Sequence, residues 1–300
     1  MKRAFAILAT IMLAAAAPGA QPLLLRAQAW TEDGPGLAHD LTHEPSECLA
    51  RSDHSIEVGR ALFRSPVVLG GPAARAGLSC HACHSNGSIN TRFLLPELTD
   101  RAGHADVTSE WASATLGDGV SNPLPIPDLV NSAGHASFGR LRVRSHTDFV
   151  LGVIEAEFQG AQPPAQAFDG LIDYLRALRL SACPADDSVA ITLASAASDV
   201  RRAVAAARSA DGATGSLLLA SAQDGMGRIV ERLPQRGFRR DRARLETLAR
   251  ELGAMRASPA AYETAAPGWS ARFDAAINRI APRERRTYFN EATLAAALGQ

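Results

Sequence analysis

Two cysteines and two histidines lie within five consecutive residues, in the order Cys-His-Ala-Cys-His over residues 80–84. This C-x-x-C-H spacing is the attachment pattern of a c-type haem. Thiols separated by two residues, here Cys80 and Cys83, can form thioethers with the two vinyl groups of one haem. The adjacent His84 is then carried beneath the iron as its proximal ligand. The pattern therefore predicts one covalently attached haem c, whose redox chemistry the protein positions and tunes.

Two other kinds of site use the C-x-x-C spacing. A zinc site would need a second Cys or His pair at similar spacing, but the remaining cysteines, Cys48 and Cys183, stand alone in the sequence. A thioredoxin-like redox pair would lie in a βαβ pattern, which is absent around residue 80. Haem attachment is therefore the interpretation that fits the motif best.

The N-terminal residues have the pattern of a secretory signal peptide. A basic pair at 2–3 precedes an apolar run over 4–17, and small residues follow at 18–20 and again at 27–29. We take residues 1–29 as the signal peptide, with an uncleaved N-terminal anchor as the alternative. Export to the bacterial periplasm, or secretion, agrees with haem c, because bacteria attach this haem outside the cytoplasmic membrane. The rest of the sequence has no apolar run of transmembrane length.

Helical periodicity bounds the segment that would hold the haem. Residues 55–63 predict a helix with Ile56, Gly59 and Phe63 on one face. Residues 165–180 predict a second, amphipathic helix with an apolar stripe of Phe168, Leu171, Ile172, Leu175 and Leu178. Helices on both sides of the motif resemble the cytochrome c fold, in which the first and last helices cross over the haem edge. The resemblance implies an all-α, cytochrome c-like haem domain over about residues 45–183.

Cys48 and Cys183 flank this predicted domain. In an oxidising compartment two remaining thiols usually pair. A disulfide here would tie the crossing helices together and stabilise the fold by about 2–4 kcal/mol. The alternative is two buried free thiols, since Cys is often a core residue.

Further motifs resemble the bacterial di-haem cytochrome c peroxidase family over residues 55–180. Residues 58–66 are similar to that family's G-R-x-L-F-x-x-P segment, and residues 78–84 to its haem box. Residues 127–131 resemble its T/P-x-L-x-N turn, and Phe138-Gly139-Arg140 occupies the place of its D/N-G-R. Family members carry two haem domains. Because this chain has a single C-x-x-C-H motif, it cannot run the two-haem relay alone.

The ligand on the sixth position of the iron is open at this stage. The resemblance implies His104, which stands in a Gly-His context in the loop after the motif. The alternatives are His135, His146, no protein ligand, or a methionine reaching over from the C-terminal part, Met226 or Met255. His146 is also explained as the first residue of a helix capped by Ser145 or Thr147. Two histidine ligands predict a closed electron carrier, whereas an open site could bind peroxide or a diatomic gas.

Peroxide chemistry would need a general base and a cation near the distal face of the haem. The candidates are Glu97, Glu110, Glu155 and Glu157 as the base, Arg140 and Arg142 as the cation, and Trp111 as an electron stepping stone. For each charged residue the alternative is a solvated surface position. For the tryptophan the alternative is ordinary packing.

The chain after Pro184 is rich in Ala, Leu and Arg and predicts a small all-helical domain over residues 187–300. Helices are expected over residues 189–209, 216–233, 242–256, 270–280 and 284–298, with Asp241 as one N-cap and a new helix starting at Ser258-Pro259. Acidic side chains outnumber basic ones in residues 1–200, and the reverse holds in residues 201–300. The arginines could dock an acidic partner or the haem domain itself, or they could form an ordinary solvated surface.

Taken together, the sequence predicts an all-α periplasmic monohaem c-type cytochrome that exchanges single electrons with a redox partner protein. One alternative is a peroxidase-related haem enzyme that acts on peroxide with a redox centre in a partner. Another is a haem-based sensor whose C-terminal bundle binds a partner. Nothing in the sequence resembles a nucleic-acid-binding module.

Overall fold

The computed structural model describes residues 23–300, apart from the side chains of residues 259–261. Residues 1–22, which hold most of the predicted signal peptide, lie outside the described residues. The described chain is mostly helical, as expected for an all-α protein. Within this part of the chain, none of the helices combines the length and apolar character that a membrane crossing requires.

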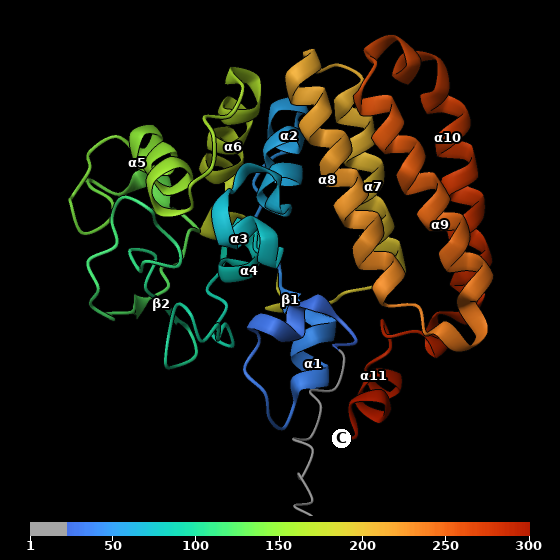
Figure 1. The fold of residues 1–300 in the computed structure, drawn as a ribbon, viewed down its shortest axis with the longest axis horizontal. Helices are drawn as coiled ribbons and strands as arrows, with labels where there is room; N and C mark the ends of the chain where they lie inside the picture. The colour runs from blue at the N-terminus through green and yellow to red at the C-terminus, as the bar shows by residue number, and fades with distance from the viewer. Residues whose placement is uncertain (1–22) are drawn as a thin grey trace, which may run out of the picture.

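The N-terminal part combines short helices with two short strand pairs. Its helices are α1 (Leu37–Thr42), α2 (His54–Phe63), α3 (Gly71–Ala76), α4 (Cys80–Cys83), α5 (His146–Gly152) and α6 (Ala165–Ala177). Its strands are β1 (His43–Pro45), β2 (His104–Ala105), β3 (Leu124–Pro125) and β4 (Ser188–Ala190). Strand β1 is antiparallel to β4, with His43 opposite Ala190, and β2 is antiparallel to β3, with His104 opposite Pro125. Long loops connect these elements and surround the segment that carries the C-x-x-C-H motif (Figure 1).

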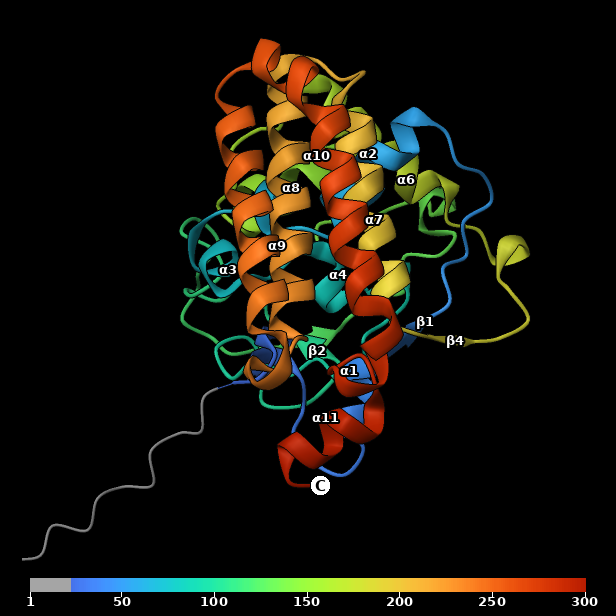
Figure 2. The ribbon, with the colours of Figure 1, turned by 90° about the vertical axis from the view of Figure 1, so that its right-hand side faces the viewer.

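The C-terminal part is a bundle of long helices followed by one short helix. Its members are α7 (Leu193–Ala207), α8 (Gly212–Glu231), α9 (Gln235–Arg256), α10 (Pro259–Ile280) and α11 (Glu291–Leu298). Helices α7 to α10 lie side by side, as both views show, while α11 returns to the N-terminal segment and packs beside α1 (Figures 1 and 2). Helix α2 lies between α6 and the bundle and contacts α6 on one side and α7 and α8 on the other.

One hydrophobic core runs through both parts of the chain. It joins Phe63 and Tyr174, on the crossing helices α2 and α6, to Trp269 and Phe273 in the bundle, and all four side chains are buried. Burial of such large aromatic side chains is a dominant source of stability. The predicted boundary between residues 183 and 187 is therefore crossed by continuous packing.

Several predicted helix ends differ from the structure because tertiary contacts decide them. The helix predicted over residues 165–180 ends at Ala177, since Leu178 is extended and forms an isolated bridge with Leu49. The helix predicted from residue 270 begins earlier, at Pro259, and runs through Pro267. The restart at Ser258-Pro259 agrees with that beginning.

Two predictions in the C-terminal part are wrong. Asp241 is not an N-cap, because α9 begins at Gln235 and the buried Asp241 carboxylate pairs with Arg283 at 2.8 Å. The helix predicted over residues 284–298 is shorter: residues 281–286 form a 3-10 turn, and α11 begins at Glu291. Asn290 caps α11 by accepting a hydrogen bond from the backbone of Thr293, which makes the break favourable.

Candidate haem-binding site

The C-x-x-C-H motif forms one short helix and its exit. Helix α4 spans Cys80–Cys83 after Ser79 at the N-cap position, and it ends because His84 leaves the helical region at φ −123°, ψ 69°. The His84 backbone N–H still bonds to the Cys80 carbonyl at 2.9 Å. Positions three apart share one face of a helix. Both cysteines are therefore presented on one side, with His84 directly after them.

Both thiols of the motif are free and half-buried. Burial raises the pKa of Cys80 to about 11 and raises that of Cys83 further. At neutral pH both are protonated thiols. They are thus unpaired and held together, as two thioether bonds to one group would require.

The His84 ring is oriented by a backbone carbonyl. Its Nδ1 lies 3.0 Å from the Pro127 carbonyl oxygen. Because a carbonyl can only accept, this contact assigns the ring proton to Nδ1 and leaves the Nε2 lone pair free. Burial lowers the pKa of His84 to about 4, against a smaller opposing effect of the Pro127 hydrogen bond. The imidazole is therefore neutral at physiological pH, which is the form that binds a metal.

The segment that orients His84 is itself fixed at several points. The Leu129 N–H bonds to the Gly87 carbonyl at 2.8 Å, just after the motif, and the Asn131 N–H bonds to the Leu178 carbonyl at 3.0 Å. The Asp128 side chain accepts from the Val130 backbone at 2.7 Å, which forms the turn. The Pro127–Asn131 turn thus joins the motif to the end of α6.

These residues fit a covalently bound haem. Free paired thiols, an imidazole with Nε2 unprotonated and a carbonyl that orients the other ring nitrogen make up the donor set such a group needs. The Asn90 side chain donates to the Ala82 carbonyl at 2.8 Å, and its backbone donates to the Cys83 carbonyl at 2.9 Å. These bonds satisfy the exposed carbonyls at the end of α4.

His104 lies in β2, opposite Pro125 of β3. Pro125 is two residues before Pro127, whose carbonyl orients the His84 ring. Its Nδ1 lies 3.0 Å from the Ala102 carbonyl, so its Nε2 lone pair is also free. The strand pairing thus attaches His104 to the same segment that orients His84.

His146 has a different environment. As predicted, it opens α5 with Ser145 as the cap, whose hydroxyl accepts from the Asp148 backbone at 3.1 Å. Its ring lies 4.9 Å from the Phe138 ring, and its buried Nδ1 has no hydrogen-bond partner among the described residues. Burial lowers the pKa of His146, and the Arg176 charge adds to this effect. A buried, neutral and unpartnered ring nitrogen is a ligand signal that the sequence alone did not show.

The other residues predicted as haem ligands or as acid–base groups differ in how far they are buried. His135, Glu97, Glu110, Glu155, Arg140 and Arg142 are exposed, while Trp111 is half-buried and packs against the core. Met226 and Met255 are buried inside the bundle, where their sulfur atoms are enclosed by its core. Glu157 is half-buried, and desolvation raises its pKa to about 7. Of the four glutamates, Glu157 therefore has the proton affinity that suits a general acid or base.

Cys48 and Cys183 are bonded to each other. The disulfide links the chain before α2 to the chain after α6, at a sequence separation of 135. Beside it, the Arg179 N–H bonds to the Cys48 carbonyl at 2.8 Å. The link closes the predicted haem domain at its two ends.

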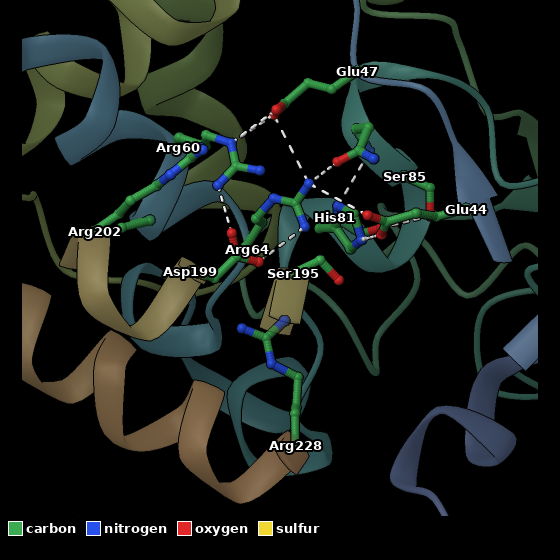
Figure 3. A network of polar contacts seen from close by, with 12 residues as sticks. Glu44, Glu47, Arg60, Arg64, His81, Ser85, Ser195, Asp199, Arg202 and Arg228 are labelled. Carbon is green, nitrogen blue, oxygen red and sulfur yellow. Dashed lines mark hydrogen bonds and ion pairs between the residues drawn. The ribbon is translucent and has the colours of Figure 1, made fainter. Parts of the chain in front are cut away.

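A buried polar network connects the motif to the bundle (Figure 3). His81, inside C-x-x-C-H, lies 3.1 Å from a Glu44 carboxylate oxygen through Nε2, and its Nδ1 accepts from the Asn86 backbone at 3.1 Å. Arg64, the C-cap residue of α2, lies between Glu44 at 3.6 Å and Asp199 on α7 at 3.3 Å. Burial alone would raise the pKa of Glu44, but Arg64 and His81 hold it well below its usual value.

The same network reaches the crossing helices. Arg60 donates from Nε to both Glu47 oxygens, at 2.8 and 2.9 Å, and from its NH1 group to Asp199 at 2.6 Å. The Tyr174 hydroxyl on α6 donates to Glu47 at 2.8 Å. The two arginines, Arg60 and Arg64, thus lie among the carboxylates of Glu44, Glu47 and Asp199, which offset the cost of burying their charge. The members of this network are far apart in the chain, so no local sequence pattern predicts it.

A charged cavity of about 170 Å³ lies on the His81 side of α4, lined also by Glu44, Arg64, Asp224 and Arg228. This cavity faces the bundle and the network, on the side of the motif that carries His81.

Comparison with protein-family models, curated proteins and solved structures gave no match for this chain. The motif and the geometry around it are therefore the features that indicate a function.

Proposed function

We propose that this protein is a periplasmic monohaem c-type cytochrome, with a cytochrome c-like haem domain, that transfers single electrons between partner proteins. The observation that carries the proposal is the contact between His84 Nδ1 and the Pro127 carbonyl, directly beside the two free thiols of Cys80 and Cys83. In c-type cytochromes the haem supplies the one-electron couple. The chain would supply the attachment, the orientation and the surroundings.

Each of these tasks has residues that suit it. Cys80 and Cys83 would hold the haem covalently, and His84 would present its neutral Nε2 to the iron. Pro127 would keep the His84 ring in one orientation, which strengthens a ligand by second-shell bonding. The Cys48–Cys183 disulfide and the continuous core would keep the surrounding helices in place, so that little rearrangement accompanies electron transfer.

The sixth position decides between a carrier and a ligand-binding protein. His104 remains the ligand that the family resemblance implies, and His146 is supported by its unpartnered Nδ1. Either would give a closed electron carrier. The second candidate function, a peroxidase-related enzyme with a partner redox centre, is favoured by the raised pKa of Glu157, about 7, which suits proton transfer.

The first experiment is a visible spectrum of the purified, dithionite-reduced protein with and without carbon monoxide. A reduced spectrum that does not change with carbon monoxide supports the carrier. A clear carbon monoxide complex would move peroxide or gas chemistry ahead of electron transfer.

Covalent attachment is tested in the same preparation by haem staining of a denaturing gel. The Cys80→Ser/Cys83→Ser double variant should lose the stain. The matched control Cys48→Ser/Cys183→Ser removes two cysteines outside the motif and should retain it. A wild-type protein that purifies without haem from a host able to mature c-type cytochromes would contradict the proposal.

A further inference from the structure

A second cluster of metal-binding side chains lies where α1 meets α11. His39 Nδ1 is 3.2 Å from a Glu291 carboxylate oxygen, and His43 Nδ1 is 3.8 Å from the same oxygen. The two imidazole rings are stacked, with centroids 4.1 Å apart. His39 lies in α1 and His43 is its extended C-cap, whose backbone N–H bonds to the His39 carbonyl, so both rings lie at the end of α1, opposite the first residue of α11.

The spacing of these groups suits a transition ion. One ligand atom from each of the three residues lies within 4.8 Å of the other two. Zinc binds imidazole nitrogen and carboxylate oxygen at about 2.0–2.2 Å, which places neighbouring ligand atoms of a tetrahedral site about 3–3.5 Å apart. Small rotations of the exposed His39 and Glu291 side chains would bring the set to that spacing.

We propose that His39, His43 and Glu291 form a divalent metal site that takes zinc. Two histidines and one carboxylate are a common zinc donor set, with a water in the fourth position. His43 Nδ1 also lies 3.2 Å from the Thr42 hydroxyl and 3.3 Å from the His39 carbonyl, and the ion replaces these weak contacts. The site is separate from the C-x-x-C-H motif and independent of electron transfer.

The ion would join the two ends of the described chain. Leu294 of α11 packs against Leu37 and Leu41 of α1 in a small apolar cluster apart from the main core. The Gln300 side chain adds two bonds, accepting from the Ala38 backbone at 3.3 Å and donating to the Gly34 carbonyl at 2.8 Å. So small a contact area holds a terminal helix weakly. A bound zinc ion would therefore act as a clamp for α11.

The test titrates zinc into the haem-loaded protein, purified without a polyhistidine tag, by isothermal titration calorimetry. Wild type should bind one zinc ion, and both His39→Ala and Glu291→Gln should weaken binding at least about tenfold, the scale on which metal sites lose affinity even from outer-shell changes. The control is His54→Ala, which removes an exposed histidine at the start of α2 and should leave the affinity unchanged.

A second readout tests the clamp directly. Zinc should slow hydrogen exchange of the α11 amides in wild type and in His54→Ala, but not in His39→Ala. Because His39 is exposed, its replacement should leave the far-UV circular dichroism spectrum unchanged. Wild-type protein that binds no zinc, or zinc affinity unchanged in both His39→Ala and Glu291→Gln, would overturn the proposal.

Discussion

Gly59 and Gly170 bring the backbones of α2 and α6 into direct contact where the two helices cross. A β-carbon added at Gly59 would lie 1.9 Å from the Gly170 carbonyl oxygen, and one added at Gly170 would lie 2.8 Å from a Val58 methyl carbon. Neither distance allows a side chain. Because α2 precedes the C-x-x-C-H motif and α6 leads to Cys183, this crossing fixes the frame around the motif.

The crossing predicts a large cost for the smallest added side chain. Gly59→Ala should destabilise the fold by about 1–3 kcal/mol or more, because the helices must separate to admit the methyl group. The matched control is Gly152→Ala in α5, where an added β-carbon meets nothing within 4 Å. That change should be neutral or stabilise by about 0.5–1 kcal/mol, since alanine is the better helix former. Urea unfolding of both variants measures the difference, and equal midpoints would refute the close crossing.

Periodicity in the sequence was sufficient to locate the crossing helices, but it was not sufficient to locate their contact. The apolar face with Ile56, Gly59 and Phe63 was predicted, and these three residues are buried in α2. The end of α6 was placed too late, because Leu178 leaves the helix to pair with Leu49, a residue distant in sequence. Helix ends set by long-range contacts carry no local signal.

The same distinction applies to the site. Cys80, Cys83 and His84 are neighbours in sequence, so their spacing alone predicted their chemistry. The partner of His81, by contrast, is Glu44, which lies 37 residues earlier, and Asp199 belongs to a different part of the chain. Fully buried charged residues are rare, and no local pattern links these distant positions, so their pairing could not be predicted from the sequence.

Removing Arg64, the cation at the centre of the buried network, should lower the free energy of unfolding. Arg64→Met removes the charge that Glu44 and Asp199 share and leaves each with one cationic or imidazole neighbour, so we expect about 3–5 kcal/mol of destabilisation at pH 7. The control is Arg202→Met, which removes a half-exposed arginine 3.9 Å from Glu57 and should cost little. Guanidinium or urea unfolding at pH 7 compares the two.

The Arg64→Met effect should also depend on pH in a defined direction. The folded-state pKa values of Glu44 and Asp199 are lowered, so their ion pairs stabilise the wild type above the ordinary carboxyl range and lose this effect as the pH falls. The gap between wild type and variant should therefore narrow below about pH 4.5, the ordinary pKa of Glu44. A gap that stays constant between pH 7 and pH 3 would show that Arg64 acts through packing alone.

The effect of Glu157 on stability should change with pH in the opposite direction to that of Glu44 and Asp199. Its folded-state pKa is raised from 4.5 to about 7 by desolvation, so the unfolded chain releases its proton first as the pH rises. The cost to the folded state is absent below about pH 4.5, grows up to about pH 7, and is constant above it. Glu157→Gln should therefore stabilise the protein at pH 8 by about 1–2 kcal/mol, discounted for partial exposure, and have no effect at pH 4.

The control for Glu157 lies two residues earlier. Glu155 belongs to the same turn, Val153–Glu157, but is exposed. Glu155→Gln should show no pH-dependent gain. Equal gains for both variants, measured by unfolding at pH 4 and pH 8, would mean that burial does not set the proton affinity of Glu157.

The ligand on the sixth position of the proposed haem can be assigned by two single variants. If His104 is the ligand, His104→Ala should make the reduced protein bind carbon monoxide, while His146→Ala leaves the spectrum as in wild type. If His146 is the ligand, the two outcomes exchange. Its buried and unpartnered Nδ1 leads us to expect the second result. His135→Ala, which changes an exposed histidine, serves as the control and should have no effect.

Leu25 and Arg26 pack against the rest of the fold, which bears on where the expected signal peptide would be cleaved. Leu25 is 1% exposed, and the Arg26 guanidinium pairs with Asp224 at 2.6 Å while its backbone N–H bonds to Glu231 at 3.2 Å. Cleavage after Ala29 would remove both residues from the fold.

We therefore expect the signal peptidase to cut at the earlier small residues, 18–20, and the intact mass of the purified protein should place the first residue before Leu25. If Arg26 is retained, Arg26→Ala should also lower the unfolding midpoint, because among the described residues it leaves the nearly buried Asp224 with Arg228 alone as a charged partner, 3.3 Å away. A mature chain that starts at Trp30 would instead mean that the bundle is complete without this segment.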